Sequence, residues 1–79
     1  MCLTLEEMAF SELGARLRQA REQKGLTRQY VAKNVGISVR TFDRWERGDF
    51  EPSLKKLARL AELYGTSIGW LIVGETNAA

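Results

Sequence analysis

Residues 28–47 read RQYVAKNVGISVRTFDRWER, and the spacing of their small and apolar residues decides the fold. Thr27, just before this stretch, and Ser38 within it are residue types that cap helix N-termini, and Gly36 between them suits a tight turn. We therefore predict a helix over 27–34, a short turn, and a second helix over 38–47. Counted from Arg28 as position one, the residues at positions four, five, eight, nine, ten, fifteen and eighteen are Val31, Ala32, Val35, Gly36, Ile37, Phe42 and Trp45.

Two short helices joined by a glycine-containing turn form a helix-turn-helix. The second helix can enter a DNA major groove about 12 Å wide only if it projects from the body of the domain. The two helices must then pack closely at a steep angle, and Ala32 supplies the small residue where they approach each other. Gly36 supplies a turn residue that tolerates positive φ. The spacing thus predicts a helix-turn-helix that binds double-stranded DNA in its major groove.

The remainder of the chain also has a helical pattern. We predict further helices over 10–24, 53–64 and 67–73, which makes the fold all-α with five helices. An earlier start of the first helix stays open, because residues 4–7 fit a capping box. The helix over 53–64 presents one apolar face, formed by Leu54, Leu57, Leu60, Ala61 and Tyr64.

Length and charge limit the organisation of the chain. Its 79 residues suffice for one domain, which we place at 11–75. Residues 1–10 are an N-terminal extension that can add a helical turn, and residues 76–79 are a flexible tail. Nine of the twelve basic residues lie between positions 16 and 48. This concentration favours a polyanion-binding face, although a solvated basic helix face would give the same pattern.

Several function classes lack the residues that they need. The chain has one cysteine, Cys2, and no histidine, and it shows no glycine-rich phosphate loop or metal-ligand cluster. We therefore expect no enzyme activity, no cofactor, no metal and no small-molecule substrate. No run of 18 apolar residues predicts a membrane span, and the first ten residues lack the basic start of a signal peptide. We expect a cytoplasmic protein, bacterial or phage-encoded, at the nucleoid.

Four segments resemble the Cro/lambda-type repressor family, also called the XRE family. They are LGARLRQAREQKGLT at 13–27, WERG at 45–48, PSLKKL at 52–57 and SIGWLIVGE at 67–75. The resemblance extends over roughly residues 11 to 75 and implies a lambda-repressor-like DNA-binding domain. It also implies a sequence-specific transcriptional regulator, most typically a repressor that binds a palindromic operator as a homodimer.

The resemblance assigns side chains to DNA contacts. Arg40 and Arg44 also share a helix face by their spacing, and arginine can donate two hydrogen bonds to guanine, although simple solvation is the alternative for both. At Arg28 the family usually has glutamine, so the arginine is expected to favour a phosphate over a bridging amide contact. The implied base contacts are Ser38, Val39, Arg40, Thr41 and Arg44. The implied phosphate contacts are Thr27, Arg28, Gln29, Arg47 and Lys55.

Three further features follow from the comparison with this family. Arg21 and Glu46 match a partly buried salt bridge, which is expected to be structural and not a DNA contact. The loop over 49–51 is often basic in the family, but here it reads DFE. Either this loop is held away from the phosphates or it weakens binding. Ile68, Trp70 and Leu71 in the last helix are the predicted dimer interface, unless they only complete the intramolecular core.

A second function class also stays open at this stage. Helices of this kind can cover a protein partner, as in a bridging factor or an antitoxin. Arg40 and Arg44 distinguish the two classes, because only a DNA-binding domain requires them for base selectivity.

Overall fold

The computed structural model describes the backbone of residues 5–74 and the side chains of residues 12–74. These residues form an all-α fold with five helices and, within that range, no strand. The predicted flexible tail at 76–79 lies outside the described residues. The helices in chain order are α1 (Leu5–Gln23), α2 (Arg28–Val35), α3 (Val39–Arg47), α4 (Leu54–Tyr64) and α5 (Ile68–Val73).

The helix boundaries follow from their capping residues. The hydroxyl of Thr27 accepts a hydrogen bond from a backbone N–H three residues on, and Ser38, Ser53 and Ser67 do the same for α3, α4 and α5. The observed bounds of α2 to α5 therefore lie within one residue of the predicted ones. The first helix differs, because α1 begins at Leu5 and not at residue 10. Most of the predicted N-terminal extension is thus part of α1.

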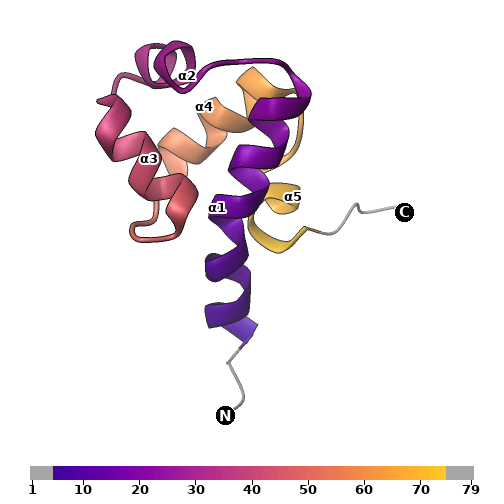
Figure 1. Ribbon diagram of the computed structural model, residues 1–79. Helices are drawn as coiled ribbons and strands as arrows, with labels where there is room; N and C mark the ends of the chain where they lie inside the picture. The colour runs from indigo at the N-terminus through magenta and orange to yellow at the C-terminus, as the bar shows by residue number, and fades with distance from the viewer. Residues whose placement is uncertain (1–4, 75–79) are drawn as a thin grey trace.

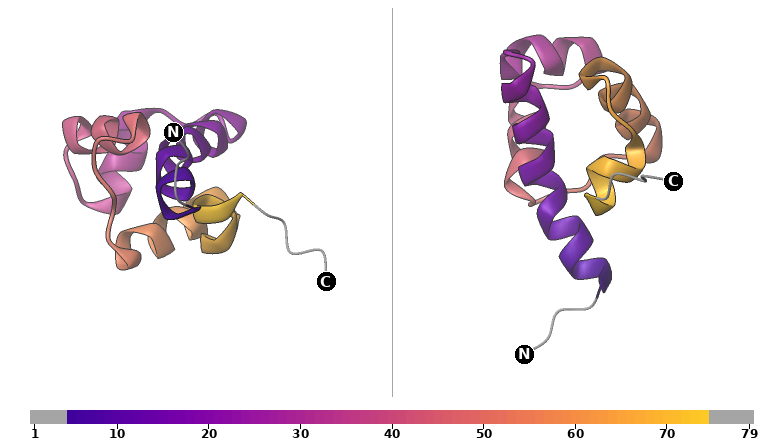
Figure 2. Two further views of the ribbon diagram at one scale, coloured as in Figure 1. Left: turned by 90° about the horizontal axis from the view of Figure 1, so that it is seen from below. Right: turned by 90° about the vertical axis from the view of Figure 1, so that its right-hand side faces the viewer.

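The long helix α1 organises the domain (Figure 1). α1 packs against both α3 and α5, while α2 packs against α3 and α4. In Figure 1, α2 and α3 lie to one side of α1, and α4 passes behind it toward α5. The N-terminal turns of α1 extend beyond the other four helices, as the right-hand view of Figure 2 also shows. The helix pair α2 and α3 is therefore supported by α1, which packs against α3, and by α4, which packs against α2.

One hydrophobic core joins all five helices. Each helix contributes one of the largest side chains that are almost completely buried: Leu17, Val31, Phe42, Leu60 and Leu71. Burial of such side chains stabilises the fold by roughly 1.5–3 kcal/mol each. The predicted apolar positions of the α2–α3 segment belong to this core. Ile37 is half-buried and packs against the core, and the other positions are buried: Val31, Ala32, Val35, Phe42 and Trp45.

The prediction for Leu54 is wrong. Its side chain is 68% exposed, whereas Leu57, Leu60, Ala61 and Tyr64 are buried. Leu54 is the first residue of α4, and its place in the helical repeat therefore falls beyond the edge of the core. Periodicity predicts the direction in which a side chain points, but it does not predict whether other residues of the protein lie there to cover it.

The turn between α2 and α3 has the geometry that fixes the angle between them. Gly36 has φ of +83°, a left-handed conformation that side-chain-bearing residues rarely adopt. The carbonyl of Ala32 accepts hydrogen bonds from the N–H groups of both Gly36 and Ile37. The ammonium group of Lys56 donates to the carbonyl of Val35 at 3.1 Å. These contacts give the Ala32 and Val35 carbonyls at the C-terminal end of α2 hydrogen-bond partners and join this end to α4.

Candidate nucleic-acid interface

The first turn of α3 is stabilised by a cap that uses two of the predicted base contacts. The Oγ of Ser38 accepts from the N–H of Thr41 at 3.0 Å and donates to the Oγ1 of Thr41 at 2.9 Å. Ser38 is exposed and Thr41 is half-buried. Their hydroxyls therefore already bond to the protein, and contact with a base edge has to share or replace those bonds.

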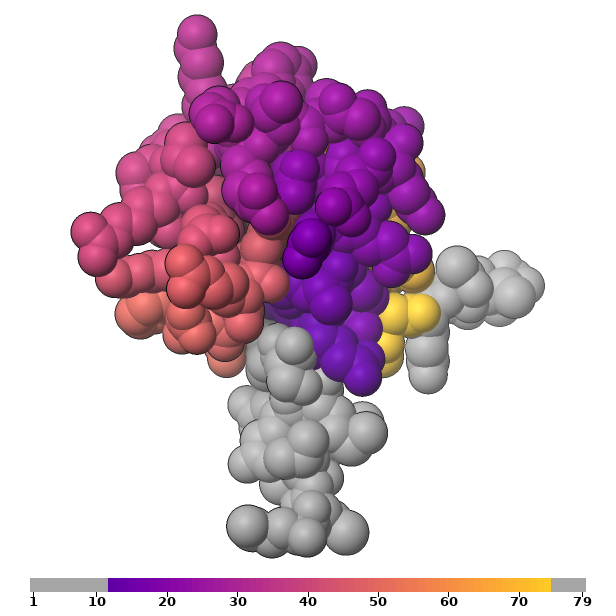
Figure 3. Space-filling view, viewed as in Figure 1, coloured from indigo at the N-terminus to yellow at the C-terminus, as the bar shows by residue number. Residues whose placement is uncertain are grey.

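The outer face of α3 presents Arg40 and Arg44. Phe42 and Trp45 on the opposite face are buried and pack edge to face, with ring centroids 6.3 Å apart. Arg40 is exposed and forms no hydrogen bond or ion pair with any residue in the described range. Val39, next to it, is 39% exposed. Long side chains project into solvent from the α2–α3 side of the molecule (Figure 3).

Arg44 differs from Arg40 in having an aromatic neighbour. Its guanidinium carbon lies 5.3 Å from the ring centroid of Phe50, which is within the range of a cation–π contact. Phe50 belongs to the acidic loop that follows α3. Sequence reasoning missed this contact, because it depends on how the loop folds back on the helix.

Arg47, predicted to contact phosphate, is exposed and pairs with Asp43. Its Nη2 donates to the carboxylate at 2.6 Å and its Nε at 3.0 Å. The hydrogen bond to Asp43 raises the pKa of Arg47. Sequence reasoning also missed this pair, although the i, i+4 spacing of opposite charges on one helix is a signal for it.

The remaining predicted phosphate contacts lie around the start of α2 and the start of α4. Thr27 and Gln29 are exposed, and the Thr27 hydroxyl caps α2 by accepting from the N–H of Tyr30 at 3.1 Å. Lys55 is exposed on the first turn of α4. The N-terminus of α2 carries partial positive charge from its backbone N–H groups, which favours an anion there.

Arg28 forms an ion pair within the protein that the sequence did not predict. Its Nε donates to the Oε1 of Glu46 at 3.0 Å, and Asp43 lies 3.9 Å from the same atom. The Arg28 side chain is 38% exposed, whereas that of Glu46 is only 3% exposed. Arg28 thus connects the first residue of α2 to the end of α3. Its Nη groups form no hydrogen bond within the described part of the chain.

Arg21 and Glu46 form a buried ion pair between α1 and α3. The Arg21 Nε lies 2.7 Å from the Glu46 Oε2, and both side chains are less than 10% exposed. Arg21 also donates to the carbonyl of Leu26 at 2.9 Å. The hydrogen bond to Glu46 raises the pKa of Arg21, while burial opposes this rise. The Glu46 carboxylate therefore joins α1, α2 and α3 on the buried side of α3.

The predicted dimer interface in α5 needs one correction. Leu71 is fully buried in the core of its own chain and therefore cannot form part of a surface. Ile68 and Trp70 are half-buried, and Val73 is 51% exposed. Leu71 was misplaced because a short apolar helix does not reveal from its sequence which side faces inward.

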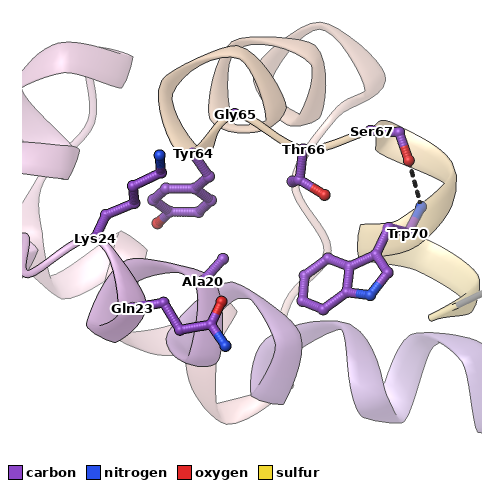
Figure 4. A pocket seen from close by; sticks show the side chains of 8 residues that line it. All are labelled: Ala20, Gln23, Lys24, Tyr64, Gly65, Thr66, Ser67 and Trp70. Atoms are coloured by element: carbon purple, nitrogen blue, oxygen red, sulfur yellow. Dashed lines mark hydrogen bonds between the residues drawn. The ribbon is translucent and has the colours of Figure 1, made fainter. Parts of the chain in front are cut away.

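A cleft of about 800 Å³ lies between the end of α1 and the α4–α5 turn (Figure 4). Trp70 and Tyr64 line it, and the N–H of Trp70 donates to the Ser67 hydroxyl. The Tyr64 hydroxyl is buried, has no hydrogen-bond partner among the described residues, and has its pKa raised by this burial. No residue of α2 or α3 lines the cleft, so it is separate from the α3 surface.

The sequence profile of the helix-turn-helix family matches residues 17–71, which include all of α2, α3 and α4. The chain belongs to the helix-turn-helix family. This assignment agrees with the observed five-helix fold and with the α2–α3 geometry, and the Cro/lambda-type resemblance is confirmed at the level of this family.

Similar proteins are helix-turn-helix regulators. A prophage-derived uncharacterized HTH-type transcriptional regulator of Bacillus subtilis, YonR, is 36% identical over 61 residues, 77% of this chain and 56% of its own length. The HTH-type transcriptional regulator DicA of Escherichia coli is 35% identical over 65 residues, 82% of this chain and 48% of its own length. The phage CTXphi transcriptional repressor RstR of Vibrio cholerae is 31% identical over 64 residues, 80% of this chain and 58% of its own length. The helix-turn-helix chain thus spans about half the length of these relatives.

No helix within the described range is both long enough and apolar enough to cross a membrane.

Proposed function

We propose that this helix-turn-helix chain binds double-stranded DNA in a sequence-specific manner and acts as a transcriptional repressor, with α3 in the major groove. The observation that carries the proposal is Arg40, an exposed arginine without a protein partner in the described range, on the outer face of a capped and anchored helix. The guanidinium of Arg40 is therefore available to bind a polyanion such as DNA. The names of similar proteins, which include a phage transcriptional repressor, support the same function.

The geometry suggests how base recognition divides among the side chains of α3. Arg40 and Arg44 can each donate two hydrogen bonds to the O6 and N7 of a guanine. Val39, 39% exposed beside Arg40, suits contact with a thymine methyl group. Ser38 and Thr41 contribute less, because their hydroxyls are already bonded within the cap.

Phosphate contacts fix the position of the helix without selecting sequence. The exposed Thr27 and Gln29 and the N–H groups at the start of α2 suit one phosphate, and Lys55 suits another. The Nε of Arg28 stays bonded to Glu46, so Arg28 contacts a phosphate through its Nη groups. Arg47 must share its donors with Asp43, so its contribution is smaller.

Selection of bound duplexes from a random pool tests the proposal. We expect an enriched palindrome whose half-sites are separated by about 34 Å, one turn of the double helix, because a twofold dimer presents two copies of α3. A pool that shows no enrichment after several rounds would overturn sequence-specific binding. Tight binding to a protein in place of DNA would favour the interaction-module alternative.

Arg40→Ala is expected to weaken binding to the selected operator by about 1–3 kcal/mol and to relax preference at one base pair. The loss arises because alanine leaves the base edge without its donors. The measurement is a titration of labelled operator and of single-base variants at fixed salt. Arg59→Ala makes the same change in α4, at an arginine paired with Glu62, and should leave both values unchanged. Equal effects from both variants would contradict direct base contact by Arg40.

The homodimer is proposed to form through α5, where Ile68 and Trp70 are half-buried and Val73 is exposed. Trp70→Glu should convert the dimer to a monomer and reduce operator binding to a single half-site, because a carboxylate is costly to bury at an apolar interface. Mass measurement in solution and on DNA checks this. Val73→Glu tests the same face at a more exposed position, and Leu54→Glu in α4 is the matched control. Dimers that persist in both α5 variants would place the interface elsewhere.

A further inference from the structure

The loop after α3 places an aromatic ring against one of the two proposed base-contacting arginines. The guanidinium carbon of Arg44 lies 5.3 Å from the centroid of the Phe50 ring. Phe50 is 56% exposed, so it does not serve to fill the core. An exposed phenylalanine between two acids, Asp49 and Glu51, has no evident role in the stability of the fold.

The backbone of the loop is bonded to α3 at its start, and the loop is buried again near its end. The N–H of Asp49 donates to the carbonyl of Arg44 at 3.0 Å, and the N–H of Gly48 donates to the carbonyl of Trp45 at 3.1 Å. Pro52, two residues beyond Phe50, is buried. The ring therefore stands on a short loop anchored to the same helix turn that carries Arg44.

We propose that Phe50 is a positioning residue that holds Arg44 ready for base contact and so sets selectivity at one base pair, an inference that rests on the proposed DNA-binding function. A free arginine side chain samples many rotamers, and binding must restrict them to one. Contact with the ring restricts them before DNA arrives.

An aromatic partner suits this role better than a carboxylate. A guanidinium can lie on a ring by its face while the N–H groups in its plane remain able to donate. A carboxylate occupies those same N–H groups, as Asp43 does for the Nε and Nη2 of Arg47. Within the described residues, neither Asp49 nor Glu51 forms an ion pair with Arg44. The donors that recognise guanine therefore stay available on Arg44.

The test compares Phe50→Leu, which keeps an apolar side chain without a ring, with Phe50→Trp, which keeps a ring. Dissociation constants are measured for the selected operator and for variants at the base pair that Arg44→Ala relaxes. We expect Phe50→Leu to reduce discrimination at that base pair by about two- to fivefold, the range of an exposed cation–π contact. Discrimination at the base pair assigned to Arg40 should not change. Phe50→Trp should retain discrimination at both.

A double-mutant comparison separates positioning from other roles of Phe50. In the Arg44→Ala background, Phe50→Leu should have no further effect on discrimination, because the side chain that it positions is absent. A uniform loss of affinity for all sequences would instead indicate a backbone contact and overturn the inference. Thermal melts of both Phe50 variants should match the unmodified chain, and a lower Tm together with uniform loss would also count against positioning.

The outcomes also separate this inference from the function on which it rests. If Arg44→Ala lowers discrimination at one base pair and Phe50→Leu does not, the positioning role fails while base recognition by Arg44 stands. If Arg44→Ala changes nothing at any base pair, base recognition by Arg44 fails, and the positioning role fails with it.

Discussion

Glu46→Gln is expected to lower the free energy of unfolding by about 3 kcal/mol, and the Tm by more than about 10 °C. The Glu46 side chain is 3% exposed and its carboxylate pairs with both Arg21 and Arg28. Glutamine keeps the shape but removes the negative charge and replaces one acceptor oxygen by an NH2 donor, so the buried Arg21 loses its counter-charge and one of the two carboxylate oxygens it pairs with. Removal of one partner from a buried pair is costly because the other charge stays buried. Thermal and denaturant unfolding measure the loss.

The matched control is Glu22→Gln, the same chemical change in an exposed pair. Glu22 lies 3.4 Å from Arg18, and both side chains are more than half exposed. Exposed pairs contribute at most about 1 kcal/mol, because water solvates both partners and salt screens them. If Glu46→Gln costs no more than Glu22→Gln, the Arg21–Glu46–Arg28 cluster has no structural role.

The elements could be predicted from the sequence because their signals are local. Thr27, Ser38, Ser53 and Ser67 each cap a helix through a backbone N–H only three residues away, so a short window of sequence contains the whole interaction. The inward side of α3 was predictable for the same reason. Phe42 and Trp45 are three residues apart and lie on one face of any helix.

The contacts that shape the candidate interface could not be predicted in this way. Spacing did not indicate that the Nε of Arg28 bonds to Glu46, which lies 18 positions away. The contact of Arg44 with Phe50 depends on the path of a loop, and the burial of Leu71 depends on how α5 meets α1. Such contacts are set by packing angles and loop paths, which periodicity does not encode. Spacing therefore predicted which side chains α3 exposes and which it buries better than what each one touches.

Gly14 illustrates the same difference with a large expected effect on stability. A Cβ atom at Gly14 would lie 2.5 Å from the carbonyl oxygen of Glu46 and 2.6 Å from that of Trp45. Both oxygens belong to the backbone of α3, so no side-chain rotation relieves the clash. Gly14→Ala is therefore expected to push the last turn of α3 away from α1 and to lower the free energy of unfolding by about 2 kcal/mol. Denaturant unfolding measures this loss.

The sign of this effect distinguishes close helix packing from helix propensity. Alanine in place of glycine within a helix ordinarily stabilises it by roughly 0.5–1 kcal/mol. Gly69→Ala in α5 should show that gain, because the nearest atom to its added Cβ is the Ser67 Oγ at 3.9 Å, an ordinary contact. If Gly14→Ala destabilises the fold and Gly69→Ala stabilises it, α1 and α3 approach each other at Gly14 too closely for a Cβ atom. A stabilising Gly14→Ala would contradict that approach, and with it the position of α3 relative to α1 on which the proposed DNA contact depends.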